Sequence, residues 1–196
     1  RRIVERLSSD HPGVTYDVTI KVEHLLQHAD LLRLLRDTGC LFVTSAVESV
    51  DDAVLEKLAK GHTRADFVRV VETCRAVGLT LSPTFVAFTP WTTLESYLDL
   101  LDTLEALDLV EQVAPIQLAI RLLVTAGSPL LELDDVKRVV QPFDGASLTW
   151  PWRHPDPRVD RLQEDVMRLV GVATRNSRQE AFDAVYSFLA DEGITV

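Results

Sequence analysis

Cysteine is scarce in this 196-residue chain, which contains only Cys40 and Cys74. So few thiols exclude the disulfide framework of small secreted proteins and predict a reducing, cytoplasmic compartment. Cys74 follows Phe67, Val70 and Val71 at helical spacing, and Cys40 opens an apolar run. We therefore expect both thiols to be small apolar core residues rather than ligands.

Other shortages narrow the class of protein. The 20 Lys and Arg residues are outnumbered by 30 Asp and Glu residues, which gives a net charge of −10. This acidity argues against a broad phosphate-binding face, so no nucleic acid partner is expected, although it leaves room for a local basic pocket. No apolar run is long enough to cross a bilayer, so no membrane partner is expected.

Motifs for common catalytic sites are also missing. The sequence has no GxGxxG, no P-loop, no HExxH and no GxSxG, so neither a nucleotide loop nor a familiar hydrolase site is indicated. His24 and His28 have the i, i+4 spacing of metal-binding helices, but no third ligand is close in sequence. We therefore expect no metal site here.

What the sequence does contain is an alternation of strand-like and helical segments. Runs rich in β-branched and aromatic residues predict strands over residues 15–22, 40–47, 79–88 and 116–124. Helical patterns lie over residues 29–38, 64–77 and 93–107. Gly39 and Gly78 follow the first two helices, where glycine is the usual stop. Strand alternating with helix predicts βα units and a parallel sheet.

The character of the chain changes after Gly127. Residues 142–157 are rich in Pro and Trp, and two helical patterns follow, over residues 158–170 and 177–191. We expect residues 1–130 to form the α/β unit and residues 131–196 a helical extension packed on it. The sequence begins at Arg1, without Met and within a helical pattern, and we expect it to be a fragment of a longer protein.

Ligands of parallel α/β folds gather at the carboxyl ends of the strands. That rule selects a set of polar residues, each of which also has a plain structural interpretation: Lys21, Glu23, Ser45, Glu48, Ser49, Thr84, Thr89 and Arg121. Glu48 directly follows the apolar Ala46 and Val47, and its carboxylate could accept hydrogen bonds from ribose hydroxyls. Arg121 lies in an apolar run and needs a carboxylate, on a cofactor, on Glu48 or in a salt bridge at the rim.

The order of these features resembles the middle of a radical SAM domain. Residues 46–49 read Ala-Val-Glu-Ser where that family has GxES, and residues 54–61 match its vLxxlxKg pattern. Residues 88–93 stand where the family has GxPgET, and residues 127–130 where it often has GTPL. Both glycines of GxPgET are lost here, and Ala46 replaces the glycine of GxES. The resemblance covers residues 15–130.

The resemblance implies the C-terminal part of a partial (β/α)6 TIM-like barrel, with about four parallel strands and the helical extension. It implies that the parent enzyme uses S-adenosylmethionine and a [4Fe–4S] cluster to form a 5′-deoxyadenosyl radical that attacks an unknown substrate. The strand with Ser45 and Glu48 would bind the ribose, and the strand with Thr84 would meet the adenine. Arg121 completes the expected cofactor-binding set, and no catalytic residue is assigned.

The CxxxCxxC loop that holds the cluster in that family is missing from this sequence. We therefore expect the chain alone to be inactive and its parent to act on a small molecule or a peptide. A non-catalytic α/β scaffold or binding module is the alternative. A TIM-barrel lyase that uses Lys21 and Glu23 is a third interpretation.

Overall fold

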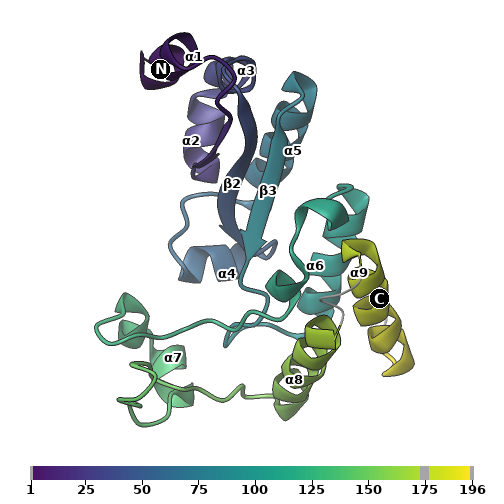
Figure 1. Cartoon of the computed structure of the whole chain (residues 1–196). Coiled ribbons are helices and arrows are strands. Elements are labelled where there is room, and N and C mark those ends of the chain that lie inside the picture. Colours follow the sequence, from purple (N-terminus) through teal and green to yellow (C-terminus); the bar gives the residue numbers. More distant parts are fainter. Residues whose placement is uncertain (1, 173–176, 195–196) are drawn as a thin grey trace.

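Three parallel strands form the sheet of this protein. The structure, a computed structural model, describes residues 2–172 and 177–194. The strands are β1 (Tyr16–Thr19), β2 (Cys40–Glu48) and β3 (Thr80–Phe85), in the order β1-β2-β3. Both neighbouring pairs are parallel, and helices connect them along the chain (Figure 1). The predicted α/β class with parallel strands is confirmed.

Helices make up most of the remaining regular structure. They are α1 (Arg2–Asp10), α2 (Val22–Gln27), α3 (Leu32–Asp37), α4 (Asp52–Lys57), α5 (Arg64–Val77), α6 (Leu94–Ala106), α7 (Asp134–Val139), α8 (Pro157–Val172) and α9 (Arg178–Asp191). Short 3-10 turns are η1 (Ala29–Leu31), η2 (Val110–Gln112), η3 (Pro115–Leu118) and η4 (Pro129–Glu132). Within the described ranges, no helix is both long and apolar enough to cross a membrane.

Helix α5 shows how local sequence sets these boundaries. Thr63 and Asp66 form a reciprocal capping box at its start, which satisfies amide groups that have no partner within the helix. Gly78 ends the helix with φ at 72°, a conformation that glycine adopts without the steric cost of a Cβ. Both signals were readable in the sequence, and the predicted bounds of this helix are confirmed.

One face of the sheet is packed against helices. Val43 and Val47 of β2 and Phe85 of β3 are fully buried. The ring of Phe85 meets that of Phe67 from α5 edge-on, with 5.9 Å between the centroids. Burial of a side chain of this size stabilises the fold by about 2 kcal/mol. This face fixes the register of the strands, because a shift by one residue would turn its apolar side chains into solvent.

The segment predicted as a fourth strand, residues 116–124, does not extend the sheet as a strand. Its first part belongs to the 3-10 turn η3, and a single isolated bridge joins Arg121 to Phe88. Pro115 starts that turn; it has no N–H to donate to a ladder, and its φ suits a helical turn. The prediction of about four strands is therefore wrong for the part of the chain that the structure describes, and the predicted four-stranded partial barrel is not confirmed.

Helices α8 and α9 share the core of the sheet, because Val166 and Val185 belong to the same apolar cluster as Val43. Residues 122–155, here called the lobe, pack instead around a separate small cluster centred on Val136 and Trp152. The lobe contains α7 and lies beyond the carboxyl ends of β2 and β3, below α4 in Figure 1. The boundary predicted at residue 130 stays a prediction, and residues 1, 173–176 and 195–196 lie outside the described part.

Candidate functional site

Toward the carboxyl ends of the strands, the second face of the sheet carries small and mostly polar side chains, while Phe42 lies on this face nearer the amino ends. In the register of the strands, Thr19 stands beside Thr44, Thr44 beside Ser82, and Ala46 beside Thr84. All five are at least partly exposed to solvent. We call this set the open face. The Ser82 hydroxyl donates to the Gln112 carbonyl at 3.3 Å. The threonine hydroxyls can donate and accept hydrogen bonds, and the small side chains leave space for a flat ligand against the sheet.

Glu48 ends β2 in an unusual backbone conformation. Its φ is 70°, and the register of β2 against β3 is irregular between Ala46 and Glu48. A non-glycine residue in the left-handed region is disfavoured by about 1 kcal/mol or more, and such residues cluster at functional sites. The carbonyl of Glu48 accepts the N–H of Val86, the residue after β3, at 2.9 Å, which helps to hold this conformation.

The side chain of Glu48 is fixed by a lysine that follows α4. Lys60 Nζ lies 3.0 Å from Glu48 Oε1, and the two side chains are 24% and 23% exposed. The other carboxylate oxygen, Oε2, accepts no hydrogen bond from the residues that the structure describes. A half-buried carboxylate that is oriented by one partner and has a vacant acceptor suits a ligand with hydroxyl groups.

The four residues predicted to bind the cofactor do not all meet. Thr84 and Glu48 are neighbours along the ladder of β2 and β3, since Thr84 pairs with Ala46 and Glu48 pairs with Phe85. Ser45 alternates with the open face and is buried on the helix-covered side, where its hydroxyl has no hydrogen-bond partner among the described residues. An unsatisfied buried hydroxyl costs about 1–3 kcal/mol.

Arg121 pairs with groups other than Glu48. Its guanidinium donates to Asp160 Oδ1 and to the Trp152 carbonyl, both at 2.7 Å, and lies 3.5 Å from the centre of the Trp152 ring. The charge is thus compensated by a carboxylate and an aromatic face. This arrangement joins the end of the sheet to α8 and to the lobe. Of the three alternatives for this arginine, the structure shows the salt bridge, with Asp160 as the carboxylate.

A second group of residues at this end of the sheet was also missed by sequence reasoning. Asp135 Oδ2 accepts hydrogen bonds from Lys57 Nζ and from Trp91 Nε1, each at 2.7 Å. The Lys57 ammonium and then the Trp91 indole hold the pKa of the Asp135 carboxyl below its usual value. These three residues come from α4, the loop after β3 and α7, so no spacing in the sequence indicates that they meet.

The two thiols do not fit an iron–sulfur cluster. Cys40 donates to the Phe42 carbonyl at 3.3 Å, and Cys74 is 1% exposed within the core. Burial raises the pKa of the Cys74 thiol to about 11, whereas a metal ligand must be a thiolate. Over residues 2–172 and 177–194, no three His, Cys, Asp or Glu side chains gather where they could hold a metal ion.

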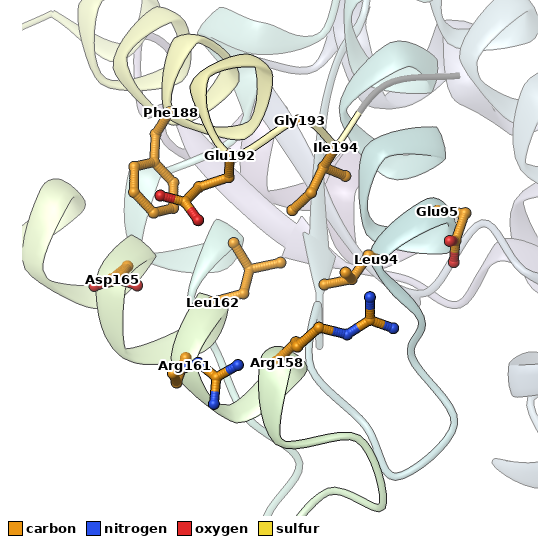
Figure 2. A pocket seen from close by; sticks show the side chains of 10 residues that line it. All are labelled: Leu94, Glu95, Arg158, Arg161, Leu162, Asp165, Phe188, Glu192, Gly193 and Ile194. Atoms are coloured by element: carbon orange, nitrogen blue, oxygen red, sulfur yellow. The ribbon is translucent and has the colours of Figure 1, made fainter.

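A separate hollow of about 410 Å³ lies between the start of α6, α8 and the end of α9. Figure 2 shows Arg158 and Arg161 on α8, with Glu192 facing them from the end of α9. Asp165 and Glu95 add further negative charge to its lining. The hollow shares no residue with the open face, and its three carboxylates outnumber its two arginines. We therefore place the candidate site at the open face.

No family model matches the chain. Solved structures do resemble it. The cobalamin-dependent S-adenosylmethionine radical enzyme OxsB, with aqua-cobalamin and S-adenosylmethionine bound, matches with a TM-score of 0.70 and 14% sequence identity, over 97% of this chain and 35% of OxsB. The Elp3 protein of the archaeon Methanocaldococcus infernus, with an N-terminal deletion, matches with a TM-score of 0.51 and 13% identity, over 93% of this chain and 43% of that one.

A curated protein also matches in sequence. The bacteriochlorophyllide d C-8(2)-methyltransferase of Chlorobaculum tepidum is 29% identical over 75 residues, which are 37% of this chain and 16% of that protein. The chain thus spans about a third or less of the length of OxsB and of this methyltransferase. Similarity at this level of identity concerns the fold. The fold of this chain is related to that of a segment of the radical SAM enzymes.

Proposed function

We propose that this chain forms the part of a radical SAM enzyme that binds the ribose and adenine of S-adenosylmethionine. The observation that carries the proposal is Glu48, held by Lys60 at the carboxyl end of β2 and next in register to the open face. Ligands of parallel α/β folds bind at this end of the strands. The structural likeness to OxsB supports the same assignment.

The residues have distinct roles in this proposal. Glu48 Oε2 accepts hydrogen bonds from the ribose hydroxyls while Lys60 keeps the carboxylate oriented. The small Ala46 lets the adenine approach the backbone, and Thr84 supplies a hydroxyl beside it. Bound S-adenosylmethionine supplies the group that is cleaved to start radical chemistry; the protein orients it and excludes water. The predicted roles of Ser45 and Arg121 in cofactor binding stay predictions.

The cluster must come from outside this sequence, because Cys40 and Cys74 are core thiols. We therefore propose that the chain acts as part of a longer enzyme, and the shares of OxsB and the methyltransferase that it spans support this view. The greater likeness to OxsB than to Elp3 favours a cobalamin-dependent parent. Its substrate is a small molecule or a peptide that the site does not identify.

Saturation-transfer NMR of S-adenosylmethionine with the 196-residue chain tests the proposal. Saturation is expected at the ribose and adenine protons and not at the methionine methyl group, since this chain supplies only the nucleoside half of the pocket. Glu48→Gln keeps the shape of the side chain but weakens the acceptor, so the ribose signals should fall by about tenfold, the loss typical of a hydrogen bond to a charged group.

Glu56→Gln is the matched control, because Glu56 is an exposed carboxylate on the neighbouring α4. It should leave the spectrum unchanged. Equal loss in both variants would assign the effect to general charge and remove Glu48 from the site. A wild-type spectrum without saturation at any ligand proton would contradict the proposal and favour the non-catalytic scaffold.

A further inference from the structure

Two arginines of the lobe differ from most others in the chain. Arg64, Arg121 and Arg178, for example, donate to carboxylates or carbonyls of the protein. The guanidinium groups of Arg138 and Arg153 donate to no acceptor within the ranges that the structure describes, and both groups line the same hollow. Two uncompensated cations in one hollow are unusual in a chain with a net charge of −10.

The backbone holds these two arginines close together. The Arg153 N–H donates to the Val139 carbonyl at 3.1 Å, and an antiparallel bridge joins Val140 to Trp152. Arg138 and Arg153 therefore flank a paired stretch of the lobe. The position of their side chains in one hollow follows from this pairing and does not require a flexible loop to close.

The hollow has a volume of about 370 Å³, and Pro90, from the loop after β3, lines it together with Pro155. It thus lies at the carboxyl end of the sheet, the same end as Glu48. Its single lining carboxylate, Asp135, already accepts hydrogen bonds from Lys57 and Trp91. Unlike the hollow in Figure 2, where three carboxylates face two arginines, this hollow has an excess of positive charge.

We propose that Arg138 and Arg153 form a binding site for the oxyanion of a small molecule, either a phosphate or a carboxylate. A guanidinium presents a planar fork of N–H donors that matches both groups in a bidentate manner. The volume of the hollow is sufficient for a small ligand. This inference goes beyond the proposed function and does not depend on it, since it concerns a second ligand and requires no S-adenosylmethionine.

Two probes that share a ring and differ in their anion, phenyl phosphate and benzoate, test the site on the whole 196-residue chain. NMR titration that follows the arginine Nε–Hε signals should show saturable shifts at Arg138 and Arg153. Arg138→Gln and Arg153→Gln should each weaken binding by about tenfold or more, because hydrogen bonds to charged groups contribute about 1.5–3 kcal/mol. Arg33→Gln is the control, since Arg33 is another exposed arginine, on α3.

The outcomes separate the alternatives. Tighter binding of phenyl phosphate identifies a phosphate ester as the ligand class, and tighter binding of benzoate identifies a carboxylic acid. Equal weakening by Arg33→Gln would mean that the anions respond to general charge, which overturns the site; so would the absence of saturable shifts at both arginines. Both side chains of the site are exposed, so far-UV circular dichroism should report an unchanged fold in the Gln variants.

Discussion

Lys57 and Asp135 lie 78 residues apart in the sequence and are joined by a bond of 2.7 Å between Nζ and Oδ2. The same carboxylate oxygen accepts from Trp91 Nε1. Asp135 therefore ties α4 and the loop after β3 to the lobe, at the end of the sheet where the candidate site lies. The contact connects the two proposed ligand sites. Lys57 belongs to α4, the helix that follows Glu48 in the chain, and Asp135 lines the hollow of Arg138 and Arg153.

Replacement of Asp135 by Asn should loosen this connection. We expect Asp135→Asn to lower the free energy of unfolding by about 1 kcal/mol at neutral pH, since the Lys57 side chain is 43% exposed and its pair is partly screened. Urea unfolding followed by tryptophan fluorescence measures this value. Asp134→Asn is the control, because Asp134 is 85% exposed and pairs with Lys137 alone among the described residues; it should change stability by less than about 0.5 kcal/mol.

The same carboxylate predicts a pH dependence. The pKa of Asp135 is lower in the folded protein than its usual value, so its contribution is present above the unfolded pKa and is lost as the pH falls through the folded pKa. The stabilities of the wild type and Asp135→Asn should therefore converge below about pH 4. A difference that stays constant down to about pH 2 would mean that the carboxylate is not the source of the effect.

Glu48 allows its backbone and side-chain effects to be separated. Glu48→Ala and Glu48→Gly both remove the carboxylate and its bond to Lys60, but only glycine adopts a φ of 70° without a Cβ penalty. We expect Glu48→Gly to be more stable than Glu48→Ala by about 1 kcal/mol, measured by chemical denaturation. Equal stability, or a more stable Ala variant, would contradict the left-handed conformation.

Sequence patterns predicted those features of the fold that depend on residues close together in the chain. The ends of α5 follow from Thr63, Asp66 and Gly78, and β2 follows from a mostly apolar run with aromatic and β-branched residues. The segment after Pro115 has the composition of a strand, but its first residues turn as a 3-10 helix. Pro115 has no N–H for a ladder, and the Gln117 side chain accepts the Phe85 N–H at 2.8 Å, which together outweigh strand propensity. The sequence Ala-Val-Glu-Ser indicated that Glu48 lies at the end of a strand. That Lys60 pairs with Glu48 depends on how α4 packs against the sheet, which the sequence does not show.

Contacts between side chains far apart in the sequence could not be predicted, for a physical reason. Arg121 was recognised as a charge in need of a partner, yet Asp160 lies 39 residues further on and is one of many carboxylates in an acidic chain. The neighbourhood of Arg138 and Arg153 depends likewise on pairing within the lobe. Spacing along a chain reports faces of single helices and strands, and it carries no information about which loops meet.

Arg121 should respond differently to two substitutions. Arg121→Lys keeps the charge near Asp160 but loses the planar stack on Trp152 and the second donor, so we expect a loss of about 1–2 kcal/mol. Arg121→Ala leaves Asp160, which is 25% exposed, with the His154 N–H as its donor but without a positive charge beside it, and a loss of about 3 kcal/mol is expected. Urea denaturation of the three proteins checks this order. A Lys variant as unstable as the Ala variant would mean that charge contributes nothing here.

Cys74 should be unreactive while the protein is folded. Its thiol is 1% exposed, and burial raises its pKa to about 11, so the reactive thiolate is rare and shielded at about pH 8. In a Cys40→Ser variant, which leaves Cys74 as the remaining thiol of the sequence, alkylation by iodoacetamide should proceed only as fast as the protein opens. Urea should restore the rate of an ordinary thiol. Rapid labelling of the folded variant at about pH 8 would place Cys74 outside the core.

The buried Cys74 thiol also predicts how stability changes at alkaline pH. Because the pKa of Cys74 is raised in the folded state, the contribution of the buried neutral thiol to stability is intact below the unfolded pKa of about 8.5. This contribution is lost as the pH rises from there toward about 11.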